Sequence, residues 1–358
     1  MSQDVTMHLS GLAIARNAAH LFDEVAEHFI EHAQVVRADN HLTLVSPLGK
    51  AEIVHLGDRL TFALSAVSAD ALLLSRTVLA EHLFYFAGDE KLDLTWSDLP
   101  LPKSLPNLHL ATLVSAADIT PNMRRLVFAC ADVRSFIGGD MHVRLLVPPV
   151  GRAPIWPKPS EDGRIDWPTG EDELLSRAYT IRAVDAAKNQ VSIDVFQHPE
   201  PGVTTPGADF ARDALPGAQV ALLGPGSGHL PQAQTIFLAG DESALPAIAR
   251  IIEELPSTTD ITALIEVWDE REEQVITPQG ALNLRWVHRR DYRPETRFSD
   301  QIIEAIAQQP ADAFLWIACE KTDVRAIKSS LRKSARTPAG KYIAWYWSRD
   351  NADFSDDD

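Results

Sequence analysis

The sequence predicts three domains of different fold class: a small α+β domain, an antiparallel β-barrel, and an α/β domain with a parallel sheet. Three observations support this order: an early proline-rich stretch, then short strand-like segments separated by turn residues, then alternating strand and helix patterns. The chain of 358 residues is long enough for two or three such domains. The expected boundaries are 1–97 for the first domain, 98–107 for a linker, 108–232 for the barrel, 233–350 for the α/β domain and 351–358 for an acidic tail.

Composition excludes several classes of protein. The 33 basic and 50 acidic side chains give a net charge of −17, which disfavours nucleic acid and anionic membranes as partners. No apolar run approaches the roughly 20 residues that span a bilayer, and MSQDVTMHLS lacks the pattern of a secretory signal. Cys130 and Cys319 are the only cysteines, too few for a four-cysteine metal site. We therefore expect a cytoplasmic enzyme without a resident metal.

The N-terminal unit combines two helices with a small antiparallel sheet. Leu21, Val25, Phe29 and Ile30 recur at helical spacing and predict a helix from about Asn17 to Ala33. The apolar run ALLLSRTVLAEHLFYF predicts a second helix over 69–86. Alternating patterns predict strands at HLTLVS, KAEIVHL, RLTFALSA and LDLTW. This is an α+β arrangement.

The middle segment is rich in short strands. They are expected at LHLATLVS, RRLVFAC, MHVRLLVP, RAYTIRAV, QVSIDVFQ and QVALLGP. One short helix is expected near Ala208–Leu215, and the Pro-, Gly- and charge-rich stretch from Pro148 to Asp172 is expected to be a surface loop. Several short strands with so little helix predict a closed or nearly closed barrel.

From about Gln234 the pattern alternates between strand and helix. Strands are expected at TIFLAG, ITALIEVWD, ALNLRWVHR, AFLWIACE and KYIAWYW. Helices are expected at DESALPAIARIIEEL, near Ser299–Gln308 and near Thr322–Ala335. Such βαβ repetition predicts a parallel sheet covered by helices on both faces. A barrel followed by such a domain is the layout of flavin reductases, although fold order alone does not establish function.

The segment Arg177-Ala178-Tyr179-Thr180 is the sharpest local signal. On a barrel strand, Arg177 and Tyr179 share one face and Thr180 lies on the other, which offers a cation, a flat ring and a hydroxyl to a flavin. The alternative is an ordinary strand with Tyr179 half-buried and Arg177 solvated. Its place in a barrel ahead of a βαβ domain favours the flavin interpretation.

A second signal follows the strand that ends near His198. Gly202 permits close backbone approach, Thr204 and Thr205 offer hydroxyls, and the helix that starts near Pro206 offers free amides to a phosphate. The alternative is a threonine helix cap, which uses the same donors. His198 is expected beside the flavin or its adenine.

A third signal is the turn after the first α/β strand, Gly240-Asp241-Glu242-Ser243. Nucleotides bind at the carboxyl edge of such sheets, although the glycine-rich dinucleotide fingerprint is absent. Asp241 and Glu242 would repel a pyrophosphate, so contacts would come through amides and the helix dipole. Glu320 ends another strand at the same edge, and the alternative for it is a solvated acid.

These motifs occur in the order expected of a known family. RAYTIR, DVFQH, GVTTPGA, GPGS, AGDESALPAIARIIEELP, FLWIACE and WYWSRD resemble the siderophore-interacting protein family over about Leu108 to Arg349. Members are FAD-dependent ferric-siderophore reductases related to ferredoxin reductases. The stretches SPLGKAEI and LTW resemble a small domain family of unknown function.

The resemblance implies a set of site residues. For FAD these are Arg177, Tyr179, Thr180, Arg182, Asp194, His198, Gly202, Thr204 and Thr205. For NAD(P)H they are Gly240, Asp241, Glu242, Ser243 and Glu320, and for the anionic ferric siderophore Arg144 and Arg349. Two departures from the family pattern are Cys319, where glycine is usual, and Trp345, where glycine usually precedes the tyrosine.

The implied chemistry needs no catalytic triad. Nicotinamide donates two electrons as hydride, iron(III) accepts one, and a flavin converts between the two. A local cluster such as Arg144, Arg182 and Arg349 could attract an anion despite the overall charge. Asp269 and Glu270 favour a free ribose hydroxyl, hence NADH, but Arg271 and Arg285 nearby weaken that inference.

Other functions fit parts of the sequence. His28-Phe29-Ile30-Glu31-His32 matches the H-x-x-E-H pattern of zinc peptidases, but a core helix with a polar outer face explains it better. A general NAD(P)H:flavin or ferredoxin-type reductase would share the flavin site without a basic substrate pocket. A non-catalytic siderophore-binding protein would have lost the flavin.

Overall fold

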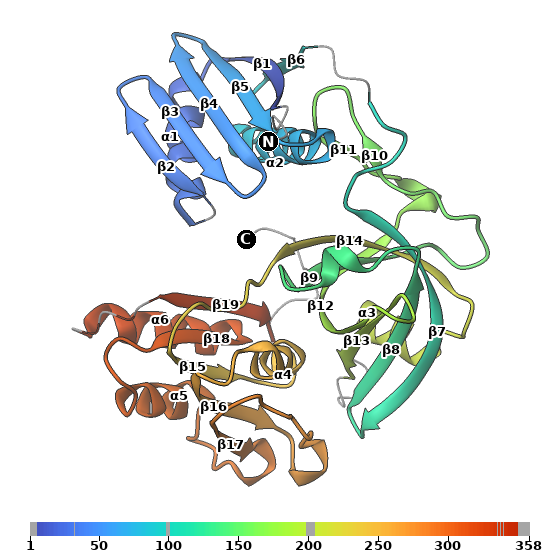
Figure 1. Cartoon of the computed structure of the whole chain (residues 1–358), viewed down its shortest axis with the longest axis vertical. Coiled ribbons are helices and arrows are strands. Elements are labelled where there is room, and N and C mark those ends of the chain that lie inside the picture. Colours follow the sequence, from blue (N-terminus) through green and yellow to red (C-terminus); the bar gives the residue numbers. More distant parts are fainter. Residues whose placement is uncertain are drawn as a thin grey trace, which may run out of the picture. The chain divides into compact units, whose positions relative to one another are not determined.

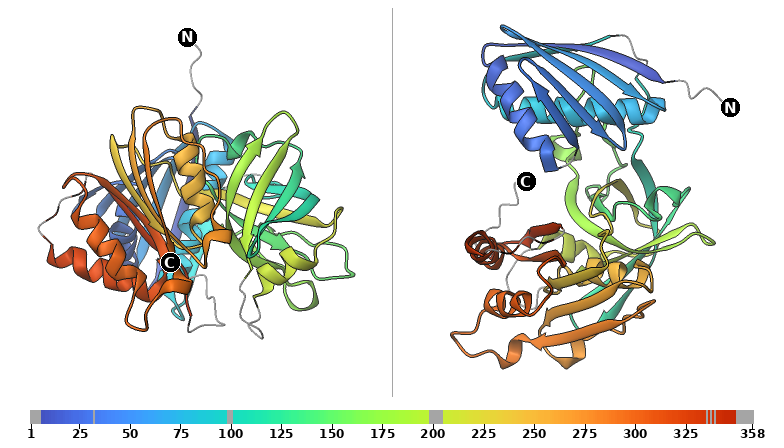
Figure 2. Two further views of the ribbon diagram at one scale, coloured as in Figure 1. Left: turned by 90° about the horizontal axis from the view of Figure 1, so that it is seen from below. Right: turned by 60° about the vertical axis from the view of Figure 1, so that its left-hand side comes forward.

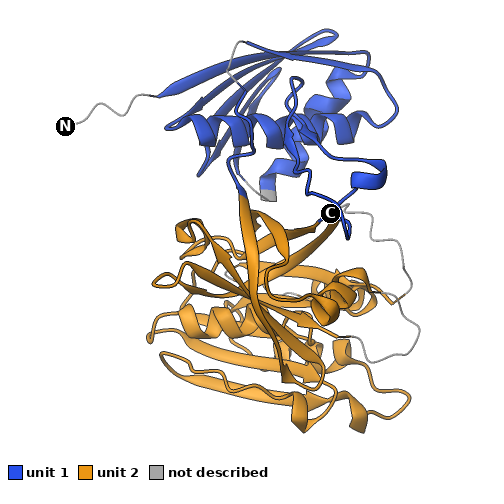
Figure 3. Ribbon diagram, turned by 90° about the vertical axis from the view of Figure 1, so that its right-hand side faces the viewer, with its two compact units in different colours: residues 1–108, 148–174 blue, residues 109–147, 175–358 orange. Residues whose placement is uncertain are grey.

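The computed structural model divides the chain into two compact units (Figure 3). Unit 1 comprises Met1–Leu108 and Pro148–Leu174, and unit 2 comprises His109–Val147 and Leu175–Asp358. The structure describes residues 6–31, 33–97, 101–197, 205–334, 336, 338 and 340–349.

Unit 1 is a two-layer α+β fold. Its antiparallel sheet has the strand order β2-β3-β4-β5-β1-β6. The strands are β1 (Met7–Ala15), β2 (Gln34–Ala38), β3 (His41–Ser46), β4 (Gly49–Leu56), β5 (Arg59–Ala66) and β6 (Leu92–Trp96). Helices α1 (Ala18–His28) and α2 (Ala69–Ala87) share one hydrophobic core with the sheet (Figure 1).

Two features of this unit differ from the sequence expectation. Strands β1 and β2 were not expected, because neither shows a regular apolar alternation: β2 has no fully buried residue among those described. The first helix ends at His28 and continues as a single 3-10 turn, Phe29–Glu31. Phe29 is buried whereas Ile30 is 66% exposed, so the expected apolar face does not extend to Ile30.

The segment expected to be a surface loop is part of unit 1. It forms the short hairpin β10 (Lys158–Pro159) and β11 (Ile165–Asp166), and Gly163 between these strands is buried. The expectation is right for most of the stretch, which is exposed or half-buried, but not for its tip, whose partners are distant in sequence. Trp96, for example, donates from Nε1 to the Asp162 carbonyl at 2.8 Å.

Unit 2 begins with a closed six-stranded barrel of order β12-β13-β8-β7-β14-β9, which confirms the expected antiparallel barrel. Its strands are β7 (Leu108–Thr120), β8 (Met123–Cys130), β9 (His142–Val147), β12 (Leu175–Asp185), β13 (Gln190–Phe196) and β14 (Gln219–Ser227). Helix α3 (Pro206–Asp213) contributes Ala208 and Ala211 to the barrel core.

The second half of unit 2 is a five-stranded parallel sheet of order β17-β16-β15-β18-β19. Its strands are β15 (Thr235–Gly240), β16 (Asp260–Val267), β17 (Leu282–His288), β18 (Phe314–Glu320) and β19 (Lys341–Trp347). Helix α4 (Leu245–Glu254) packs on one face, and α5 (Phe298–Ala307) and α6 (Lys321–Lys333) pack on the other. The predicted helices on both faces are therefore confirmed. Among the described residues, no helix has the length and apolar character required to cross a bilayer.

Helix α4 lies between the parallel sheet and the barrel (Figure 2). Arg250 on this helix is 1% exposed and donates to the main-chain carbonyls of Ile181 and Phe136, both at 2.8 Å. Its Nε donates to Glu254 at 2.8 Å. All of these groups lie in unit 2, so one buried cation fixes the helix against strand β12.

We expect Arg250→Met to lower the free energy of unfolding by about 2–4 kcal/mol. The substitution leaves the Ile181 and Phe136 carbonyls buried without their donor. Arg325→Met, at an exposed position of α6, is the matched control and should change stability by no more than about 0.5 kcal/mol. Chemical denaturation measures both, and equal stability of the two variants would contradict this role of Arg250.

Candidate functional site

The R-A-Y-T segment of strand β12 pairs with β9, and the pairing of β12 with β13 begins at Ile181. In its register with β9, Ala178 pairs with Arg144, Tyr179 with Val143 and Thr180 with His142. Val143 belongs to the barrel core, so Tyr179 lies on the core side of the strand and Thr180 on the opposite side. This is the division of faces expected from the sequence.

The start of helix α3 lies directly against Tyr179. A Cβ atom built on Gly207 would be 2.1 Å from the Tyr179 hydroxyl and 3.4 Å from Cγ of Arg177, so only glycine fits there. Burial raises the pKa of Tyr179 to about 12, so its hydroxyl stays protonated near neutral pH. The structure thus brings Arg177, Tyr179 and the helix start together.

The helix-cap interpretation of the threonines is not supported for Thr205. This residue precedes α3, but its side chain makes no capping hydrogen bond. Pro206 occupies the first turn, where its missing N–H costs nothing. His198, Gly202 and Thr204, also expected at this site, lie outside the described residues.

The charges of Asp194 and Arg182 are paired with other side chains of the protein. Arg125 donates to both Asp194 carboxylate oxygens, at 2.6 and 2.7 Å. Arg182, buried like Asp194, donates to both oxygens of Glu253 on α4, at 2.6 and 2.8 Å. The structure therefore places these two expected FAD residues in an ion-pair network rather than against Tyr179 and Gly207.

The order of strands in the parallel sheet reverses between β15 and β18. The chain leaves β15 toward β16 on one side and later returns to β18 on the other, which is the switch point where ligands bind in such sheets. A Cβ on Gly240 would lie 2.5 Å from the Ala318 carbonyl, so glycine allows the two strands to approach here.

The other residues expected at the carboxyl edge of this sheet are held by local hydrogen bonds. Asp241 accepts from the Ser243 amide at 3.0 Å and from Nε1 of Trp347 at 2.7 Å. Glu320 accepts from the Thr322 amide at 2.7 Å and from the Arg349 amide at 3.2 Å. The turn after β15, the start of α6 and the end of β19 therefore lie together at the carboxyl edge of the parallel sheet.

The alternative raised for Glu320, a solvated acid, is wrong, because this residue is 3% exposed. Glu242 is also 3% exposed and pairs with Arg289, which also pairs with buried Glu266 at 2.8 Å. Burial is the main cause that raises the pKa of Glu242 to about 7, and the Arg289 charge opposes it. The expected direct repulsion of a pyrophosphate is thus reduced, because Asp241 and Glu242 are buried and one is ion-paired. Arg289 was missed, and the basic run after strand β17 was its only sequence signal.

The Asp269 carboxylate also has partners within the protein. Its carboxylate accepts from Nη2 of Arg271 at 2.7 Å and from Nη1 of Arg290 at 3.3 Å, and the residue is fully buried. The sequence suggested that this acid would receive a ribose hydroxyl. The structure instead uses it to hold two arginines.

A polar network connects strand β19 with the barrel, and sequence reasoning missed it. The Tyr346 hydroxyl lies 2.8 Å from Nε2 of His142, and Nδ1 of His142 lies 3.2 Å from the Ser227 hydroxyl. Tyr342 adds a hydroxyl 3.4 Å from that of Tyr346. Burial lowers the pKa of His142 to about 4. The aromatic terminal segment KYIAWYW was the available signal.

The two arginines expected to bind substrate lie on separate strand regions. Arg144 is half-buried on β9, opposite Ala178 of β12 and Leu223 of β14. Arg349 is exposed, with its guanidinium carbon 5.7 Å from the ring centroid of Trp347.

The two departures from the family pattern have different environments. Cys319 is fully buried in the core that faces α5 and α6, and burial raises the pKa of its thiol. Its side chain therefore packs under the sheet edge rather than over it. Trp345 is half-buried beneath the Lys321 ammonium, which lies 4.6 Å from the ring.

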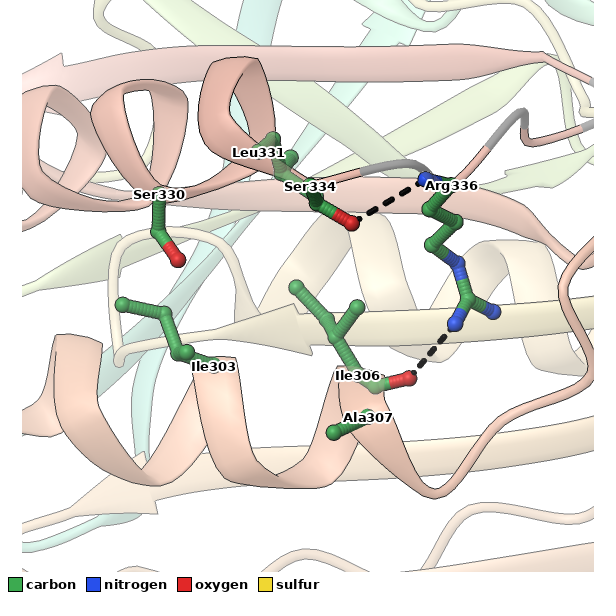
Figure 4. A pocket seen from close by; sticks show the side chains of 7 residues that line it. All are labelled: Ile303, Ile306, Ala307, Ser330, Leu331, Ser334 and Arg336. Atoms are coloured by element: carbon green, nitrogen blue, oxygen red, sulfur yellow. Dashed lines mark hydrogen bonds between the residues drawn. The ribbon is translucent and has the colours of Figure 1, made fainter.

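Two other features do not form a candidate site. Within the described ranges, no group of three or more His, Cys, Asp or Glu residues could hold a metal ion, and His32 of the H-x-x-E-H pattern lies outside those ranges. A pocket between α5 and α6 is lined mainly by Ile303, Ile306 and Leu331 (Figure 4). Its one cationic lining residue, Arg336, donates to the Ile306 carbonyl at 2.9 Å.

The low pKa of His142 predicts a pH-dependent stability. The unfolded chain binds a proton on this imidazole below about pH 6.5, whereas the folded protein binds it only near pH 4. The contribution of His142 to the free energy of unfolding is complete above pH 6.5. It is lost as the pH falls toward 4, by up to about 1.4 kcal/mol per pH unit.

Denaturation between pH 4 and 8 tests this dependence. Glu242, whose raised pKa makes stability fall as the pH rises, opposes His142 in this window, so His142→Gln should make the slope of stability against pH more negative between about pH 4 and 6.5. His20→Gln, at an exposed histidine, should leave the profile unchanged. A profile that His142→Gln does not alter would contradict the role of this imidazole.

Comparison with known families matches all three regions. Residues 233–350 match the model described as "Siderophore-interacting protein", and residues 112–229 match "Siderophore-interacting FAD-binding domain". Residues 13–97 match "Uncharacterized protein conserved in bacteria (DUF2218)".

Individual relatives agree with these matches. An uncharacterized protein of Mycobacterium tuberculosis is 32% identical over 266 residues, which cover 68% of this chain and 90% of that protein. The ferric vibriobactin reductase ViuB of Vibrio cholerae is 28% identical over 247 residues, covering 67% and 89%. The crystal structure of a siderophore utilization protein from T. fusca is 29% identical, covers 72% and 97%, and has a TM-score of 0.53. The chain belongs to the siderophore-interacting protein family, with an FAD-binding barrel of that family and an additional N-terminal DUF2218 domain.

Proposed function

We propose that this protein is an FAD-dependent, NAD(P)H-driven ferric-siderophore reductase that releases iron(II) in the cytoplasm. The observation that carries the proposal is the close packing of Tyr179 against the start of α3, inside a barrel of the siderophore-interacting FAD-binding type. A relative that this chain resembles over 89% of its length is named a ferric vibriobactin reductase.

The barrel residues fit an FAD molecule. The amides at the start of α3 and the cation of Arg177 suit a pyrophosphate, and the ring of Tyr179 suits the flat flavin. Thr180 would offer its hydroxyl from the other face of the strand, and Thr205 its hydroxyl beside α3. His198, Gly202 and Thr204 are proposed to complete the site.

We assign Asp194 and Arg182 an indirect role at this site. Their ion pairs with Arg125 and Glu253 hold strands β12 and β13 and helix α4 in position. They would act as positioning residues and need not touch the FAD.

The nicotinamide coenzyme is proposed to bind at the carboxyl edge of the parallel sheet. Gly240 provides the close approach, and the main-chain groups of Asp241, Glu242 and Ser243 line the turn before α4. Glu320, at the end of the neighbouring strand β18, holds the start of α6.

Bound FAD supplies the conversion of a two-electron donor into single electrons for iron(III). The protein's own residues need only hold and orient the reactants, because this chemistry requires no side-chain acid or base. Arg144 and Arg349 are proposed to attract the anionic ferric siderophore.

The direct test is iron release by the purified protein. A preparation that binds FAD, oxidises NADH or NADPH, and yields iron(II) from a ferric siderophore in the presence of an iron(II) chelator is expected. Coenzyme oxidation with a protein acceptor but without iron release would favour a general reductase. Protein that cannot be reconstituted with FAD would favour a non-catalytic siderophore-binding role.

We expect Gly207→Ala to weaken FAD binding at least tenfold, because the new Cβ would overlap the Tyr179 hydroxyl at 2.1 Å. Adding Tyr179→Phe removes that hydroxyl and leaves 3.2 Å to the nearest ring carbon, so the double variant should recover part of the affinity. Gly139→Ala, where no atom lies within 4 Å, is the control. FAD titration by fluorescence measures all three, and unchanged affinity in Gly207→Ala would refute this placement of FAD.

We expect Arg144→Ala and Arg349→Ala to raise the KM for ferric siderophore about 5- to 20-fold while the FAD content stays constant. Each substitution removes one cation from the proposed binding surface. Arg325→Ala on α6 is the charge-matched control. Loss of FAD from either variant, or an unchanged KM in both, would show that these arginines are misassigned.

A further inference from the structure

The loop of residues 148–174 joins two barrel strands yet packs in the other unit. Strands β9 and β12 form a hairpin in which Val147 pairs with Leu175, so the whole loop is its connection. The loop nevertheless belongs to unit 1 together with residues 1–108 (Figure 3). We propose that it is a docking element, and that the N-terminal domain carries a specific binding surface for its hairpin tip.

The binding surface, called the socket below, is formed by five residues. Arg76, Ala80 and Phe84 recur at intervals of four along α2 and so share a face of this helix, Glu81 lies next to them, and Trp96 comes from β6. Each of the five contacts the segment from Ser160 to Ile165.

The socket binds the main chain of the tip. Arg76 is 2% exposed and donates to the Ser160 carbonyl at 2.6 Å, and Trp96 donates to the Asp162 carbonyl at 2.8 Å. Glu81 accepts from the Ile165 amide at 2.7 Å. Two donors and one acceptor thus match a particular path of the chain, which is the mark of a specific interaction.

Gly163 makes the fit selective. Its φ of +104° disfavours any residue with a side chain, and a Cβ there would lie 2.8 Å from both Ala80 Cβ and Trp96 Nε1. The next residue, Arg164, places its guanidinium carbon 3.8 Å from the ring centroid of Phe84. The partner that fits this surface is a tight hairpin turn with glycine at its apex, followed by a cation.

Hydrogen bonds within the turn itself also stabilise it. Asp162 accepts from the Arg164 amide at 3.1 Å and from its guanidinium at 2.8 and 3.0 Å. The Ser160 amide donates to the Arg164 carbonyl at 2.8 Å. A preorganised tip loses little conformational freedom on docking, so a short segment can bind with useful affinity.

Docking by the loop implies that the N-terminal domain stays bound even when its covalent linker is cut. A protease recognition sequence can replace the exposed residues 101–104 in the full chain. After cleavage we expect both fragments to elute together in size-exclusion chromatography at micromolar concentration. Separation of the wild-type fragments would overturn the proposal. This experiment does not depend on the reductase activity proposed above.

A matched pair of glycine substitutions locates the interaction. Gly163→Val should weaken association of the cleaved fragments about ten- to hundredfold. Gly151→Val lies in the same loop at a positive φ of +79°, but no atom lies within 4 Å, so association should be unchanged. Fragments of Gly163→Val that stay together as tightly as those of Gly151→Val would show that the loop is not the docking element.

A milder variant keeps the test valid if Gly163→Val impairs folding. Arg164→Ala changes an exposed side chain and should weaken association about two- to fivefold through loss of its contact with Phe84. In the intact chain, Gly163→Val should also increase hydrogen exchange in α2 around residues 76–84, and Gly151→Val should not. Unchanged association in Arg164→Ala together with unchanged exchange in Gly163→Val would refute the assignment.

Discussion

Arg250 carries a charge into the junction between the parallel sheet and the barrel, where water cannot solvate it. Burying an unpaired cation would cost several kcal/mol, but this guanidinium has a carbonyl, a second carbonyl and a carboxylate as partners. The carbonyls belong to β12 and to the short turn that contains Phe136, so they fix the direction as well as the distance of α4. A hydrophobic side chain at this position could fill the space but could not specify that direction.

The placement of α4 has consequences at both of its ends. Near its C-terminus, Glu253 holds Arg182, three residues beyond Tyr179 on the same strand. At its N-terminus, the helix follows directly from the turn that contains Asp241 and Glu242. One helix therefore sets the relation between the barrel strand with the R-A-Y-T segment and the carboxyl edge of the sheet. At each of these two places a glycine also permits an approach that a Cβ would prevent, Gly207 on Tyr179 and Gly240 on Ala318.

The sequence predicted what depends on local pattern and missed what depends on distant partners. All six barrel strands and all five strands of the parallel sheet follow from alternation or from apolar runs. The packing of the loop of residues 148–174 could not be predicted, because Gly163 and Arg164 contact Ala80 and Phe84, which are far from them in the sequence. Arg289 and His142 were missed for the same reason: their partners, Glu242 and Tyr346, lie far from them in the sequence.

The acidic composition and an anionic substrate are compatible once the carboxylates are located. Asp241, Glu242 and Glu266 at or near the sheet edge are almost fully buried, and each is hydrogen-bonded or ion-paired inside the protein. Arg289 offsets part of the charge of Glu242 and Glu266, and charges beyond a Debye length of about 8 Å are screened at physiological salt. The potential at the proposed siderophore site would therefore depend mainly on the nearest partly exposed side chains, for which Arg144 and Arg349 are the candidates.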